Sequence, residues 1–114
     1  GASSQDVSGA HGAEEMTVRV WEYGPGHEMA YHRHRPQEEV YRLLSGGPQE
    51  VQIDGEHVTV DDGDWLRLPK DTPRRIRNRT DRTAVWLTLG APRGEGIMDG
   101  IRLDPDTGEE IPRA

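Results

Sequence analysis

Two histidines and a glutamate are the residues whose types and spacing indicate metal chemistry. His32 and His34 are separated by a single residue, and Glu39 follows after Pro36. Residues two apart in a β-strand project from the same face, so both imidazoles would point in one direction. Pro36 ends that strand, and we expect a second strand beginning near Glu39, paired antiparallel to the first, to bring the carboxylate beside the imidazoles. Two imidazoles and a carboxylate suit divalent iron, and nickel, manganese and zinc accept the same ligands.

Composition limits the chemistry further. The chain of 114 residues has no cysteine, which excludes thiolate ligands, disulfides and cysteine nucleophiles. A formal net charge of -7 and a pI near 5.1 argue against a nucleic-acid-binding surface. No apolar run approaches the roughly 18 residues of a membrane span, and the first residues lack the apolar region of a secretion signal. We therefore expect no membrane association and a cytoplasmic location.

The elements that must position these side chains are short strands. Proline and glycine interrupt the chain at short intervals, and apolar residues alternate or run briefly between them, which is typical of an all-β sandwich or barrel. In the first strand, Met16, Val18 and Val20 share one face. Asp54 and Gly55 predict a hairpin turn because both tolerate a positive φ. The predicted strands cover residues 16–23, 28–33, 39–45, 50–53, 57–60, 65–68, 73–77 and 83–89, with a further edge strand within 97–103.

A chain of this length fits one domain. Hydrophobic residues make up 32% of the sequence and the mean hydropathy is -0.89, so the core must be small and the strands amphipathic. We expect a flexible N-terminal leader over residues 1–15, where small and polar residues dominate, a barrel over 16–103, and a loose C-terminal tail over 104–114 that begins with turn-forming residues.

The segment around the two histidines resembles the first characteristic motif of the cupin superfamily. That motif is Gly, five residues, His-x-His, three or four residues, Glu, six residues and Gly. Gly26, His32, His34, Glu39 and Gly46 match every position, with four residues between the second histidine and the glutamate. The resemblance implies a double-stranded β-helix (jelly-roll) barrel in which the motif residues line one mouth, with His32, His34 and Glu39 as metal ligands.

A second cupin motif is matched with two departures. Gly63, Pro69 and Asn78 stand at the spacing of that motif, and the two motifs with their flanking strands span roughly residues 16–90. Asp71 stands where the motif has glycine, a mild change because aspartate also suits turns. Arg74 stands where the motif has a histidine, the fourth metal ligand of the superfamily.

Arg74 leaves two outcomes open. Arginine keeps its proton at any accessible pH and cannot ligate a metal. In the register that the resemblance implies, Arg74 points inward and lies near the metal site. Either His32, His34 and Glu39 still hold an ion while Arg74 binds an anionic group of a substrate, or Arg74 pairs with Glu39 and replaces the metal, which would leave a metal-free binding pocket.

The predicted function is therefore that of a metal-dependent cupin enzyme, dioxygenase-like or isomerase-like, acting on a small anionic molecule. The cofactor would be divalent iron, nickel, manganese or zinc. Arg74 and Tyr41 are the predicted catalytic residues, since Tyr41 follows Glu39 by two positions and should face the same cavity. The alternative is a metal-free cupin module that binds or senses a small anionic metabolite. The resemblance also implies a homodimer.

Overall fold

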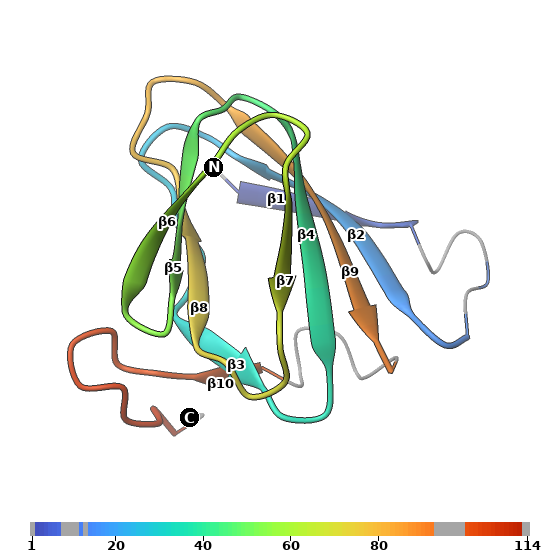
Figure 1. Cartoon of the computed structure of the whole chain (residues 1–114), viewed down its shortest axis with the longest axis vertical. Coiled ribbons are helices and arrows are strands. Elements are labelled where there is room, and N and C mark those ends of the chain that lie inside the picture. The colour runs from blue at the N-terminus through green and yellow to red at the C-terminus, as the bar shows by residue number, and fades with distance from the viewer. Residues whose placement is uncertain (1, 8–11, 13, 93–99, 113–114) are drawn as a thin grey trace.

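Two five-stranded antiparallel sheets face each other in the computed structural model, which describes residues 2–7, 12, 14–92 and 100–112 (Figure 1). The predicted all-β architecture is confirmed, with ten strands in the described residues. The first sheet has the order β1 (Ala2–Asp6), β2 (Thr17–Tyr23), β9 (Ala84–Ala91), β4 (Glu38–Ser45) and β7 (Trp65–Leu68). The second has the order β10 (Gly100–Arg102), β3 (His32–His34), β8 (Arg74–Arg77), β5 (Gln49–Ile53) and β6 (Glu56–Val60).

Most predicted strands are confirmed with ends that differ by at most two residues, among them all those from β4 to β9. The strand predicted over 28–33 is shorter, because only His32–His34 form β3, and Glu28 makes an isolated bridge to Arg77. The predicted edge strand appears as β10, while residues 97–99 of that prediction lie outside the described ranges.

Two turns show why the sequence requires particular residues there. Asp54 and Gly55 have φ values of 50° and 84° and connect β5 to β6, as the hairpin prediction required. Gly46 has a φ of 90°, and a Cβ on it would lie 2.2 Å from the carbonyl oxygen of Thr83. A glycine is needed at position 46 because both the backbone conformation and the space exclude a side chain.

The expected antiparallel pairing of the histidine strand with the glutamate strand is wrong. Strand β3 pairs with β10 and β8, whereas β4 pairs with β7 and β9 in the other sheet. Both edges of each strand are thus occupied by other partners, and the segment around Pro36 crosses from one sheet to the other. Glu39 consequently approaches the histidines across the interior of the barrel.

The interior changes from polar to apolar along the first sheet. In the register of β2 and β9, Arg19 lies opposite Thr88, and two positions further along Trp21 lies opposite Trp86. Tyr23, Leu43 and Trp86 are at most 2% exposed and belong to the hydrophobic core. Burial of a side chain such as Leu43 contributes about 2 kcal/mol to stability. One end of the barrel is therefore filled by the core, and the polar end is left for a site.

Both chain ends differ from expectation where the structure describes them. Within the predicted leader, Ala2–Asp6 form β1, which pairs with β2 along its whole length. An edge strand needs only backbone hydrogen bonds, so a polar composition does not exclude it. The rest of the leader includes residues 8–11 and 13, which lie outside the described residues.

The predicted loose tail is also attached over the part that is described. Leu103 forms a bridge with Glu110, and Arg33 and Arg35 both pair with the Glu110 carboxylate. Residues 113–114 are not described. Within the described ranges, no helix has the length and apolarity that crossing a bilayer requires.

Candidate metal centre

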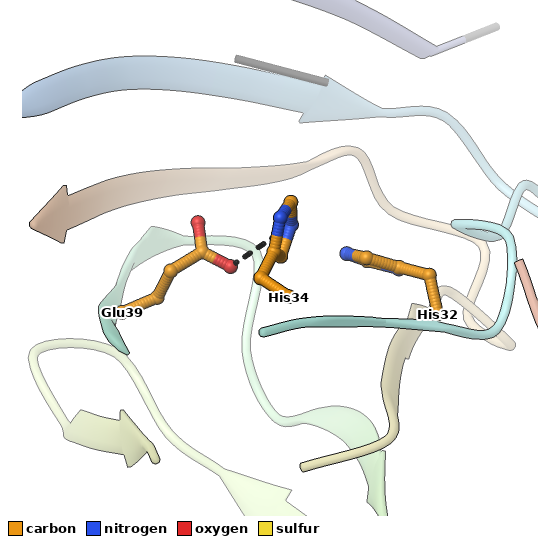
Figure 2. A group of neighbouring side chains, drawn as sticks. All are labelled: His32, His34 and Glu39. Carbon is orange, nitrogen blue, oxygen red and sulfur yellow. Dashed lines mark ion pairs between the residues drawn. The ribbon is translucent and has the colours of Figure 1, made fainter. Parts of the chain in front are cut away.

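The two histidines and the glutamate meet inside the barrel, as the sequence predicted. Each residue of this triad (His32, His34 and Glu39) offers one ligand atom, and these atoms all lie within 4.8 Å of one another. His34 Nε2 lies 3.6 Å from Glu39 Oε1, the pair joined by the dashed line in Figure 2. Donors that share one ion through bonds of about 2 Å lie roughly 3–4 Å apart. Small side-chain adjustments therefore suffice for the triad to fit a divalent ion.

His32 is held in the state that a metal ligand requires. Its Nδ1 donates a hydrogen bond to the carbonyl oxygen of Ala30 at 2.7 Å, which leaves the lone pair of Nε2 available. Figure 2 shows a ring nitrogen of His32 directed toward His34. Burial lowers the pKa of His32 to about 4, a net shift that the hydrogen bond to Ala30 opposes. The neighbouring Arg74 and His34 support this lowering of the pKa. The imidazole is thus neutral at pH 7 and can coordinate a cation.

One oxygen of Glu39 is shared among several neighbours. Arg74 Nη2 donates to Glu39 Oε1, and the Tyr41 hydroxyl donates to the same oxygen at 3.4 Å. Within the described ranges, both of these donors bind Oε1, and the second oxygen of the carboxylate accepts no hydrogen bond from them. Burial and the Glu39 charge raise the pKa of Tyr41, so the phenol keeps its proton and acts as a donor.

The Arg74 side chain points into the barrel, but it pairs with Glu39 and does not line the cavity. Its side chain is 0% exposed, and Ile76 on the same face is equally buried, whereas Arg75 and Arg77 are partly exposed. Arg74 Nη1 donates to the carbonyl oxygen of Thr72 at 2.8 Å, and Nη2 is bound by Glu39. The guanidinium is not among the groups that line the cavity, so the structure does not bring it to the space where a substrate anion would bind.

A cavity of about 490 Å³ opens next to the triad. This volume is in the range of pockets that hold small molecules. All three triad residues and Tyr41 line it. The other residues that shape its walls include Thr17, Arg19, Trp21, Met29, Thr88 and Arg102.

Sequence reasoning missed Arg19, Trp21 and Arg102 as members of the site. The face of β2 that lines the cavity carries Arg19 and Trp21, opposite to the aliphatic face formed by Val18 and Val20. This alternation was visible in the sequence, but nothing there indicated that the polar face would turn inward. Arg102 could not be found by spacing, because its place depends on β10 pairing with β3.

Comparisons with known proteins agree with this architecture. The family model described as the cupin domain matches residues 19–90. No curated protein sequence matches the chain significantly.

Solved structures resemble the chain over most of its length. A cupin-superfamily sugar phosphate isomerase from Silicibacter pomeroyi matches with a TM-score of 0.76 and 26% identity, covering 82% of this chain and 60% of that one. A putative sugar phosphate isomerase from Acidithiobacillus ferrooxidans matches with a TM-score of 0.72 and 25% identity, covering 79% and 58%. A cupin protein from Bacteroides fragilis matches with a TM-score of 0.73 and 26% identity, covering 82% and 79%. The chain thus spans only 60% and 58% of the two isomerase structures.

Proposed function

The chain belongs to the cupin domain family, whose double-stranded β-helix fold it has, and on this premise we propose that it is a metal-dependent enzyme for a small anionic molecule. The observation that carries the proposal is the convergence of three ligand atoms within 4.8 Å of one another on the wall of a cavity. His32, His34 and Glu39 would hold the ion.

The donor set suits divalent iron, nickel, manganese or zinc. Such an ion, when bound, supplies a Lewis acid that polarises an oxygen of the substrate. The protein contributes the rest of the site. Tyr41 keeps its proton and donates to Glu39, and because it also lines the cavity it can donate to a substrate oxygen. Arg74 donates to Glu39 Oε1 and thereby holds the carboxylate in place.

We propose an isomerase-like reaction as the leading activity. Two of the similar structures carry that activity in their names, a sugar phosphate isomerase and a putative one, at 26% and 25% identity. A sugar phosphate is a small anion, in keeping with the substrate class proposed here. The dioxygenase-like alternative is supported by the ligand set alone, since two histidines and a carboxylate also serve oxygen-dependent iron enzymes.

The hydrogen-bonded ion pair of Arg74 and Glu39 favours a second candidate function, a metal-free binding module or sensor for a small anion. A fixed positive charge next to the carboxylate opposes the binding of another cation. The convergence of the three ligand atoms and the neutral His32 favour the metal-dependent enzyme instead.

The activity can be tested by proton exchange. The metal-loaded protein should exchange a carbon-bound hydrogen of a sugar phosphate with solvent deuterium, as followed by NMR, and His34→Ala should abolish this exchange. His57→Ala is the matched control, because His57 is exposed and pairs with Glu50 away from the cavity. Equal exchange in wild type and His34→Ala would contradict a metal-dependent isomerase. The homodimer and the cytoplasmic location stay predictions.

A further inference from the structure

We propose that Arg19 and Arg102 form the anion-binding part of the cavity and recognise an oxyanion of the substrate, a phosphate or a carboxylate. This inference rests on the proposed function, because it assigns the recognition of the substrate at the same site. It moves the anion-binding role from Arg74, which is fully buried behind Glu39, to two arginines that line the open space.

The two arginines line the same cavity from different sheets. Arg19 lies on β2 of the first sheet, in register with Thr88 on β9. Arg102 lies on β10 of the second sheet, directly opposite His32 on β3. Because Arg102 is paired with His32 and the triad lines the same cavity, an anion bound there would lie near the candidate metal ligands.

Both guanidinium groups have capacity left for a ligand. Arg19 Nη1 donates to the neutral Ser4 hydroxyl at 3.2 Å, and its nearest carboxylate oxygen, on Asp6, is 3.8 Å from Nη2. The Arg19 Nε is buried without a hydrogen-bond partner in the described structure. Arg102 forms no ion pair with any described residue, whereas Arg75, Arg77 and other arginines of the outer surface pair with carboxylates.

The local charge favours an anion although the whole chain is acidic. The formal net charge of the chain is -7, yet the described residues that line the cavity include two arginines and one carboxylate, that of Glu39. This carboxylate is compensated from behind by the buried Arg74. The Asp6 carboxylate lies 3.8 Å from Arg19, outside this lining. The described wall thus carries more positive than negative charge, at the partly buried Arg19 and the exposed Arg102, which favours the binding of an anion.

The other residues that line the cavity indicate the chemistry of the rest of the ligand. Trp21 and Met29 offer an aromatic and an aliphatic surface, and Thr17 and Thr88 bring hydroxyl groups. These suit a short carbon chain that carries polar groups. A guanidinium binds phosphate or carboxylate through paired hydrogen bonds, so two of them can fix the orientation of such a small anion.

The test is the binding of inorganic phosphate, and separately of succinate, to metal-stripped protein by isothermal titration calorimetry. Arg19→Gln and Arg102→Gln should each raise the dissociation constant of at least one of these probes about tenfold. The phosphate and succinate arms distinguish a phosphate ligand from a carboxylate one. Arg79→Gln is the matched control, since Arg79 is exposed, pairs with Glu50 and lies outside the cavity, and it should bind as wild type does.

Arg19→Lys keeps the charge but loses the paired hydrogen bonds. It replaces Arg19→Gln in the binding experiment if the glutamine variant does not fold. It should bind the anion more weakly than wild type. Unchanged affinity in the Arg19 and Arg102 variants, or a wild type that binds neither probe, would overturn the inference.

Metal content measured on the same samples separates this inference from the proposed function. If wild type holds no metal but binds phosphate through both arginines, the inference stands and the metal-dependent function falls. If metal binds normally but the anion affinity is the same in the Arg19 and Arg102 variants as in wild type, the metal site stands and the inference falls.

Discussion

Arg74 and Glu39 form the buried ion pair on which the chemistry of the site depends. Arg74 is 0% exposed and is held by Glu39 and by the carbonyl oxygen of Thr72. A guanidinium cannot lose its charge, so Arg74 keeps a fixed positive charge beside the Glu39 carboxylate. The arginine that replaces a histidine ligand of the superfamily thereby becomes a positioning residue for the remaining carboxylate ligand.

The ion pair makes a stability prediction. Glu39→Gln should lower the free energy of unfolding by about 3 kcal/mol, because it leaves the buried Arg74 charge without its partner. The double variant Arg74→Met with Glu39→Gln should recover most of that loss, as measured by urea unfolding. The single variant Arg74→Met completes the comparison. If the loss of unfolding free energy in the double variant equals the sum of the two single losses, the pair is not coupled.

His32 makes a prediction about pH. Its pKa is about 4 in the folded protein against an ordinary value of 6.5, so below pH 6.5 the unfolded chain binds a proton that the native state does not. Stability of the metal-stripped protein should therefore fall as pH drops from about 6.5 to 4, by up to about 1.4 kcal/mol per pH unit from this group. His32→Gln should show a shallower fall in urea unfolding over this interval. Parallel slopes in both proteins would refute the assignment.

At the scale of elements, Asn78 joins segments that are distant in sequence. Its Nδ2 donates to the carbonyl oxygens of Tyr23 at 2.9 Å and Arg82 at 2.6 Å, and its Oδ1 accepts from the backbone and hydroxyl of Thr80. It is 1% exposed. The end of β2 and the turn between β8 and β9 are thus fixed to each other, which sets the position of the strands that carry Arg19 and Arg74.

Removal of this connection should be costly. Asn78→Ala should lower the free energy of unfolding by about 2 kcal/mol, because it removes the side-chain donor of the buried Tyr23 carbonyl and the acceptor of Thr80. Asn78→Asp is a matched test, since aspartate retains the acceptor for Thr80 but cannot donate to the two carbonyls. A loss below about 1 kcal/mol in both variants, measured by denaturant unfolding, would contradict this role.

The elements differ in how far the sequence could predict them. Turn residues such as Asp54 and Gly55 have a local cause, so the strands beside them could be located closely. Strand β1 has no apolar alternation, and its only signature is backbone pairing with β2, which a sequence does not display. The pairing of β3 could not be predicted either, because the choice of partner depends on which sheet each strand joins.

On the scale of the whole molecule, the candidate metal site spans both sheets. Its histidines come from β3 in one sheet and its glutamate from β4 in the other. The three ligands could be predicted because the motif places them close in sequence. Arg19 and Arg102 could not, because they lie 83 positions apart and only the folded barrel brings them to one cavity.

A bound ion should therefore stabilise the entire barrel. Metal at about 100 times its dissociation constant should raise the free energy of unfolding by about 2.7 kcal/mol, and a chelator should reverse this. Thermal unfolding with and without the metal measures the effect. The His32→Ala, His34→Ala double variant should show no shift, and a shift equal to that of wild type would mean that the ion binds elsewhere.

The most direct test of the central claim is metal content by mass spectrometry on untagged wild type and on the His32→Ala, His34→Ala double variant. Both proteins should first be dialysed against iron(II), nickel, manganese or zinc, and then against metal-free buffer. The account predicts close to one ion per chain in wild type for at least one of these metals and none in the variant. A wild type that stays empty with every metal would contradict the metal-dependent function, and Arg74 would then be the replacement of the ion in an anion-binding pocket.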